Sequence, residues 1–239
     1  MVSIVKVFTI NTPQKHDLCC AICNIINSEN DTLIYSEFCL NKLKCRQFIR
    51  EMPQAMAAPI TSHQKIRETG GIMYIIVEKE IFEDSNFQNY CNMRNIQVMD
   101  LLNPIPTYIY KMCLLYTLEC KLTSQWNKVG SYLVKGQNFL SSTENVNAIK
   151  MNIKEIYDDK SRLYLEAVNL KIPFIKHESA QLLKYGDLHP PVHVLPSMRM
   201  ANVLCVSKNL QENHPFKNYK ELREYWTNVV RIYYLQLIS

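Results

Sequence analysis

The chain begins with a short apolar and β-branched run, residues 2–10, which the segment Asn11-Thr12-Pro13 closes. A short apolar run that ends at a turn signal of this kind is typical of a strand that is covered on both faces. We therefore predict a buried strand over residues 2–10.

The next segment has apolar residues at helical spacing. Thr12 followed by Pro13 is a favourable helix start, because proline at the first helical position gives up an N–H group that would be unpaired anyway. The pattern predicts a helix that continues to a polar break at 27–31. Its apolar positions are Leu18, Ala21, Ile22, Ile25 and Ile26.

Helical spacing recurs twice more along the chain. One predicted helix begins at Asn41 and ends at Pro53, with an apolar face made of Leu43, Phe48, Ile49 and Met52. The other covers 107–121, with an inner stripe made of Ile109, Met112, Cys113, Tyr116 and Cys120. Both stripes follow the spacing of a helix that packs one face against a core.

Between these helices the pattern changes three times. Residues 53–71 hold two prolines and a glycine pair without periodicity, which predicts a mobile loop. Residues 72–77 are an apolar run that predicts a strand, and the polar stretch 82–95 is compatible with a solvated helix.

Two runs of strict alternation surround a short acidic turn. Apolar residues alternate with polar ones over 149–153 and again over 163–168, and the polar segment 158–161 separates the two runs. This pattern is typical of an antiparallel hairpin, and Pro173 closes it because proline cannot donate to the ladder. A further strand is predicted over 200–207.

The last predicted helix begins at Asn218, with Glu221 three residues later as in a capping box. The chain then ends on an apolar, strand-like stretch at 232–238, which indicates that the fold continues further or is cut short. Together the elements predict an α+β fold: a mostly antiparallel sheet with a long hairpin over about 148–172, and flanking helices. We expect one unit over 1–239, or two subdomains over 1–100 and 101–239.

Composition agrees with a folded domain. The chain has 239 residues, 47% of them hydrophobic, and a net charge of +5 from 27 basic and 22 acidic side chains. These values exclude a disordered or collagen-like chain, and the weak positive charge permits a polyanionic partner without requiring one. The start of the chain has no signal-peptide pattern and no stretch predicts a membrane span, so we expect a cytoplasmic or nuclear protein whose nine cysteines stay reduced.

One cysteine pair has the spacing of a metal site. Cys20 and Cys23 form a Cys-x-x-Cys pair, and His16 lies one turn from Cys20 on the predicted helix. A structural zinc ion needs four ligands, which two such pairs normally supply, and the chain has no second pair. We therefore expect Cys19 and Cys23 to fill an apolar helix face, with no metal and no cofactor.

Catalytic motifs are absent from the sequence. It holds no Gly-x-Ser-x-Gly elbow and no glycine-rich phosphate loop, so no catalytic residue is predicted and a non-enzymatic role is favoured. Near the end, Tyr219, Lys220 and Arg223 combine aromatic and basic side chains as in a platform for single-stranded nucleic acid. The same residues also fit the solvated face of an amphipathic helix.

A set of motifs over about residues 121–226 supports a family resemblance. Its characteristic residues are Trp126, Gly136, Phe139, Leu195, Pro196, Ser197, Met198, Pro215, Phe216 and Trp226. In these motifs and their order the chain resembles the uncharacterised chromosome 18 open reading frame 63 protein family, for which no activity is established. The order of elements from Gly136 onward is also similar to the linker and PAZ region of Argonaute and PIWI proteins, and PAZ domains bind RNA 3′ ends in an aromatic pocket.

These observations favour a non-enzymatic protein-interaction or scaffold module, with a protein partner that the sequence does not identify. The alternative is a PAZ-like module that binds single-stranded RNA, as the second resemblance implies. An enzyme without a recognisable motif is the third reading.

Overall fold

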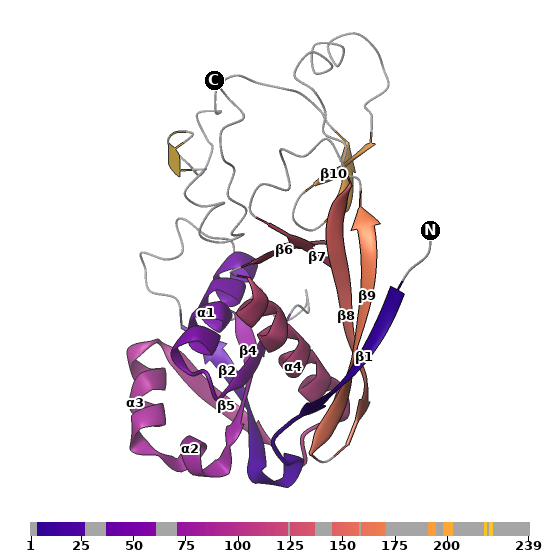
Figure 1. Ribbon diagram of the computed structural model, residues 1–239. Coiled ribbons are helices and arrows are strands. Elements are labelled where there is room, and N and C mark those ends of the chain that lie inside the picture. Colours follow the sequence, from indigo (N-terminus) through magenta and orange to yellow (C-terminus); the bar gives the residue numbers. More distant parts are fainter. Residues whose placement is uncertain are drawn as a thin grey trace. The chain divides into compact units, whose positions relative to one another are not determined.

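The protein forms two compact units, described separately below. The first unit comprises 1–5, 123–150 and 166–239, and the second comprises 6–122 and 151–165. The computed structural model describes residues 4–26, 37–60, 71–123, 125–136, 145–157, 159–170, 191–194, 198–202, 218 and 220–221. Helices flank antiparallel sheets in this part of the chain, which confirms the predicted α+β class (Figure 1).

A four-stranded antiparallel sheet is the centre of the second unit. Its strand order is β3-β4-β2-β5, with strands β2 (Leu18–Ile25), β3 (Met56–Pro59), β4 (Ile72–Glu78) and β5 (Ile96–Leu102). A short 3-10 turn, η1 (Lys15–Asp17), leads into β2. The helices of this unit are α1 (Glu37–Glu51), α2 (Lys79–Glu83), α3 (Ser85–Met93) and α4 (Thr107–Leu122).

Each face of this sheet carries its own hydrophobic core. Alternate residues of β2 point to opposite faces, so Cys19 and Cys23 belong to one cluster and Leu18 and Cys20 to the other. The first cluster is completed from α1 and α3 by Cys45, Phe48, Ile49, Phe87 and Cys91. The second is completed from α4 and β8 by Ile109, Tyr110, Cys113, Leu114 and Ile153.

A second sheet has five strands in the order β1-β9-β8-β7-β6. They are β1 (Ile4–Asn11), β6 (Trp126–Val129), β7 (Tyr132–Lys135), β8 (Val146–Ile156) and β9 (Lys160–Leu170). Strands β8 and β9 form the predicted hairpin, closed where the Tyr157 N–H donates to the Lys160 carbonyl at 2.7 Å. Two short strands, β10 (Pro191–Val194) and β11 (Arg199–Asn202), pair antiparallel.

Several predictions are confirmed by these elements. The helices at 41–52 and 107–121, the strand at 72–77 and the long hairpin are all present. The Glu221 N–H donates to the Asn218 Oδ1 at 3.0 Å, so Asn218 caps a helix start as predicted. Strand β11 covers the beginning of the strand predicted over 200–207, and the rest of that range lies outside the described residues.

Three predictions are wrong. The helix predicted from Thr12 is the strand β2, whose apolar residues serve two cores and therefore lack the alternation of a one-sided strand. The loop predicted over 53–71 contains the buried strand β3, which tolerates Pro59 because it lies at a sheet edge. The strand predicted as buried over 2–10 is β1, and seven of its eight residues are exposed, all except Ile10.

Candidate functional site

Strand β1 exposes apolar side chains on both of its faces. Ile4 and Phe8 share one face and are 59% and 45% exposed, while Val5 and Val7 share the other and are 54% and 51% exposed. In the described part of the chain β1 has a single neighbour, β9, so its other side is a sheet edge. We call this surface, made of Ile4, Val5, Val7 and Phe8, the β1 edge.

Strand β3, an edge strand of the four-stranded sheet, is buried instead of exposed. All four of its residues are buried, and the Thr117 side chain of α4 bonds to the Ala57 backbone. The Ala57 N–H donates to Thr117 Oγ1 at 3.1 Å, and that hydroxyl donates to the Ala57 carbonyl at 3.4 Å. A helix therefore covers the β3 edge, which is a common protection against pairing with another chain. The four apolar side chains of the β1 edge, in contrast, are each about half exposed.

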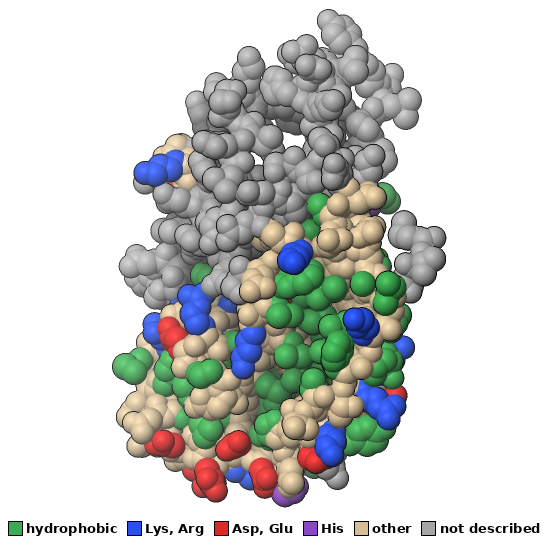
Figure 2. Space-filling model, viewed as in Figure 1, with side chains coloured by type: hydrophobic (Ala, Val, Ile, Leu, Met, Phe, Trp, Pro, Cys, Tyr) green, Lys and Arg blue, Asp and Glu red, His purple; other side chains and the backbone are tan. Residues whose placement is uncertain are grey.

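Figure 2 shows how side chains of each kind are distributed on one face of the molecule. Hydrophobic side chains gather over the part of this face where Figure 1 labels β1 and α4, and Lys and Arg side chains are spread around them. Asp and Glu side chains are concentrated at the lower end of the same face. The apolar surface is therefore bordered by charge, as protein-binding surfaces commonly are.

Basic and aromatic side chains meet on the outward side of the hairpin. Lys154 Nζ lies 4.7 Å from the centre of the Tyr164 ring, within the range of a cation–π contact. Glu155 accepts hydrogen bonds from Tyr164 and Tyr157 at 2.9 Å each and pairs with Arg162 at 2.8 Å. We call these five residues the hairpin cluster.

The carboxylate of Glu155 organises the hairpin cluster. Hydrogen bonds from Tyr164 and Tyr157, with the charge of Arg162, lower the pKa of Glu155. The hydrogen bond to Glu155 in turn raises the pKa of Tyr164. Because Glu155 offsets one of the two cations, the cluster carries a single excess positive charge at neutral pH, and Tyr157 remains 51% exposed.

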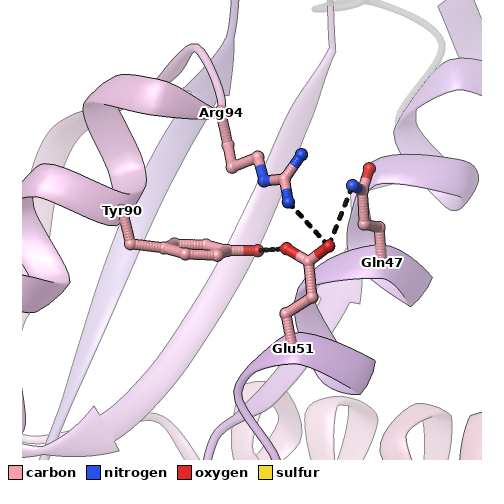
Figure 3. A network of polar contacts seen from close by, with 4 residues as sticks. All are labelled: Gln47, Glu51, Tyr90 and Arg94. Carbon is pink, nitrogen blue, oxygen red and sulfur yellow. Dashed lines mark hydrogen bonds and ion pairs between the residues drawn. The ribbon is translucent and has the colours of Figure 1, made fainter.

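A second polar network joins α1 to α3 (Figure 3). Glu51 accepts from the Tyr90 hydroxyl at 2.6 Å, from Arg94 at 2.8 Å and from Gln47 at 3.1 Å. Burial alone would raise the pKa of Glu51, but the hydrogen bonds from Tyr90 and Gln47 and the charge of Arg94 outweigh it and lower that pKa. The side chains of Gln47, Tyr90 and Arg94 all donate hydrogen bonds to Glu51, so the network is a structural link between the two helices.

The three candidate metal ligands, His16, Cys20 and Cys23, do not come together. Strand β2 places Cys20 and Cys23 in the cores on opposite faces of the sheet, and the exposed His16 pairs with Asp17 at 3.3 Å. Burial raises the pKa of the Cys20 thiol to about 12 and that of Cys23 further. Within the described ranges, no group of three or more His, Cys, Asp or Glu side chains is placed to hold a metal ion.

Of the predicted nucleic-acid residues, Lys220 is exposed at the helix start that Asn218 caps, while Tyr219 and Arg223 lie outside the described residues. Among the family motifs, Trp126 is half-buried on β6, Gly136 has φ +91° and Met198 packs against the small core of the first unit. The motif residues outside the described part are Phe139, Leu195, Pro196, Ser197, Pro215, Phe216 and Trp226.

Sequence reasoning missed the β1 edge and most of the hairpin cluster. The signal for the first was Lys6, a charge in the middle of an apolar run, which edge strands often carry. The signal for the second was the regular alternation itself, which places Lys160, Arg162 and Tyr164 on one side of β9.

Comparison with known families gives one result. A family model described as a domain of unknown function, DUF4708, matches residues 5–185 and 173–236. The chain belongs to the DUF4708 family. In this DUF4708 protein the match includes all of β1 except Ile4, the hairpin cluster and the four-stranded sheet. Among the described residues, no helix has the length and apolar character that crossing a membrane requires.

Proposed function

We propose that this DUF4708 protein is a non-enzymatic protein-interaction module and that the β1 edge is its contact surface. A partner would supply an extended segment that pairs with β1 through main-chain hydrogen bonds. The single observation that carries the proposal is that four large apolar side chains of one edge strand are each about half exposed.

Physical chemistry supports this reading of β1. An exposed apolar edge strand favours pairing with other chains, so monomeric proteins usually shorten, charge or cover such edges. Here β3, one of the two edge strands of the other sheet, is covered through Thr117 and Ala57, whereas β1 exposes large apolar side chains on both of its faces. Burying half-exposed valines and aromatics against a partner removes apolar surface from water, which is the main favourable term in association.

The test compares two matched pairs of substitutions. Val5→Lys with Val7→Lys places charges on one face of β1, and Met99→Lys with Leu101→Lys does the same on β5, where these side chains are 54% and 48% exposed. Both variants should keep the melting temperature of the parent, because the replaced side chains already contact water. Proteins that co-purify from cell extract are then quantified for the parent and for each variant.

We expect one or more partners to be retained by the parent and by the β5 variant and lost by the β1 variant. Each such partner is then purified and its affinity measured, with an expected loss of at least about tenfold for the β1 variant, equal to about 1.4 kcal/mol. A partner set that is unchanged, or reduced equally in both variants, would contradict the proposal.

Single-stranded RNA binding is the second candidate, and the hairpin cluster favours it. Lys154 and Arg162 lie beside Tyr157 and Tyr164, so cations and aromatic rings occur together as in stacking surfaces. The ring of Tyr164 already contacts Lys154, which leaves Tyr157 as the ring available for a base.

Fluorescence anisotropy with short single-stranded and duplex RNA at two salt concentrations tests this candidate. Binding should weaken steeply with salt and prefer free 3′ ends, and Tyr157→Ala with Lys154→Ala should weaken it, whereas Lys79→Ala on α2 should not. Binding that is absent at micromolar protein, or that both variants share equally, would remove the RNA reading.

We also place the protein in the cytoplasm or nucleus. None of the seven cysteines whose side chains the structure describes forms a disulfide, and six of them are buried. Buried reduced thiols agree with a reducing compartment.

A further inference from the structure

Strand β1 carries one charge in the middle of its apolar surface. Lys6 lies between Val5 and Val7, and it is exposed. Strand alternation places its side chain on the same face as Ile4 and Phe8. The Lys6 ammonium group forms no ion pair or hydrogen bond with another residue that the structure describes. Its charge is therefore available to a partner.

The strands beside Lys6 add to this positive charge. Together β1, β9 and β8 hold five Lys or Arg side chains against two Glu side chains, so the three strands carry a net positive charge. One of the two carboxylates, Glu155, is already paired with Arg162. A segment with a negative charge is therefore attracted to this part of the sheet, and a segment with a positive charge is repelled.

The position of Lys6 disfavours a second copy of β1 as the occupant of the β1 edge. When the apolar stretches 4–8 of two antiparallel copies are aligned, Ile4 lies opposite Phe8 and the two Lys6 side chains lie opposite each other. Like charges directly opposite each other on paired strands are destabilising. An acidic residue at the same point of a partner strand replaces this repulsion with attraction.

Strand β5, an edge of the four-stranded sheet, has the opposite charge. Asp100 lies between the exposed side chains of Met99 and Leu101. The pairing of β5 with β2 has a register shift, and the Leu101 N–H already donates to Asp100 Oδ1 at 2.8 Å. Irregular pairing and a charge both hinder the addition of a further strand at an edge. An acidic segment therefore has a reason to choose β1 over β5.

We propose that the partner segment on the β1 edge is an extended apolar segment with one Asp or Glu side chain opposite Lys6; this inference rests on the proposed function. Side chains directly opposite each other on antiparallel strands are about 5 Å apart at Cβ, so the carboxylate reaches the ammonium group. The apolar neighbours of the acidic residue cover the four side chains of the β1 edge. Lys6 thus determines which segments bind and in which register.

Three synthetic peptides with blocked ends and a fluorescent label test this inference. The first is Thr-Ile-Val-Glu-Val-Ile-Thr, and the other two have Gln or Lys in place of the central Glu. Their affinities for the full chain are measured by fluorescence anisotropy at low and at high salt. The same titrations are made with Lys6→Glu, with Lys6→Gln, and with Lys79→Glu, a matched charge reversal at an exposed position on α2.

The parent should bind the Glu peptide at least about threefold more tightly than the Gln peptide, and the Lys peptide more weakly than either. Lys6→Glu should reverse this order, Lys6→Gln should largely remove it, and Lys79→Glu should keep it. High salt should reduce the preference for the Glu peptide in the parent, because salt screens exposed charges. Equal affinities for the three peptides, or an order that Lys6→Glu leaves unchanged, would overturn the inference.

A further variant separates this failure from failure of the proposed function. Val5→Ser with Val7→Ser removes apolar contact from the β1 edge without adding charge. If it abolishes the binding of all three peptides and their affinities for the parent are equal, the β1 edge is a contact surface that does not select by charge. If it leaves binding intact, the peptides bind elsewhere, which contradicts both proposals. A parent that binds none of the peptides overturns the inference alone, since co-purification decides the proposed function.

Discussion

Glu51 illustrates how one side chain can join two helices that are distant in sequence. It lies in the last turn of α1 and accepts hydrogen bonds from Tyr90 and Arg94 of α3 and its C-cap (Figure 3). Below it, the Tyr90 ring makes an edge contact with Phe48 of the core, with ring centres 5.8 Å apart. The network therefore covers a rim of the first core cluster and orients α3.

Replacing this carboxylate tests its role. Glu51→Gln should lower the free energy of unfolding by about 1 kcal/mol, because the pair with Arg94 is partly exposed. The folded pKa of Glu51 is lowered, so its contribution is present above the unfolded value of about 4.3 and is lost as pH falls through the folded pKa.

The measurement is urea unfolding of the parent and of Glu51→Gln between pH 7 and pH 3. The two curves should differ at neutral pH and converge in acid, while Glu80→Gln on α2 should follow the parent throughout. A difference that persists unchanged at low pH would show that the carboxylate charge is not responsible.

Gly71 is a second position where one residue decides the local structure. Its φ is +121°, and an added Cβ would meet the side chain of buried Asn41, whose Nδ2 donates to the Ile72 carbonyl at 3.1 Å. Gly136 has φ +91° but open space around it. The two glycines therefore share a backbone conformation that other residues adopt only with strain, but only at Gly71 would an added Cβ also clash with a neighbour.

We predict that Gly71→Ala destabilises the protein by more than about 1 kcal/mol, and by more than Gly136→Ala does. Thermal unfolding of both variants measures the difference, which isolates the collision with Asn41. Equal losses at the two glycines would mean that only the backbone conformation matters.

Among the helices and strands, the sequence predicts the elements that have one face in the core and one face in solvent. It does not predict the elements whose burial depends on segments that are distant in the sequence. In helix α1 and in the β8–β9 hairpin, the side chains alternate between core and solvent. The hydrophobic periodicity of their sequences therefore predicts these elements correctly. Strand β2 packs against two cores, so its run of apolar residues is predicted as a helix. The strands β6 and β7 have four residues each, which is too short to show a hydrophobic period. The exposure of β1 depends on its place at the edge of a sheet, for which Lys6 is the single local signal.

The thiols of β2 give a prediction about that strand. Burial raises the pKa of Cys20 to about 12 and that of Cys23 further, so both remain protonated near neutral pH. Because the thiolate is the reactive form, iodoacetamide should modify neither in the native protein and both after unfolding. Mass spectrometry of the alkylated peptides measures this, and rapid labelling of native Cys23 would show that β2 opens readily or is not buried as described.

At the scale of the whole molecule, each unit combines its own core with segments from different parts of the chain. The central hairpin residues 151–165 belong to the second unit, and its outer parts belong to the first. The family match begins at residue 5 and so includes nearly all of β1. We propose that this strand, which has β9 as its one neighbour among the described residues, is where a protein partner binds.

The most direct measurement of that claim is hydrogen–deuterium exchange of the protein alone and in complex with the partner identified by the paired variants. Pairing of a partner strand with β1 would place its outward amides in hydrogen bonds. We predict slower exchange over residues 4–11 in the complex, with β5 at 96–102 unchanged. Exchange in β1 that is identical in the free and bound protein would contradict the account.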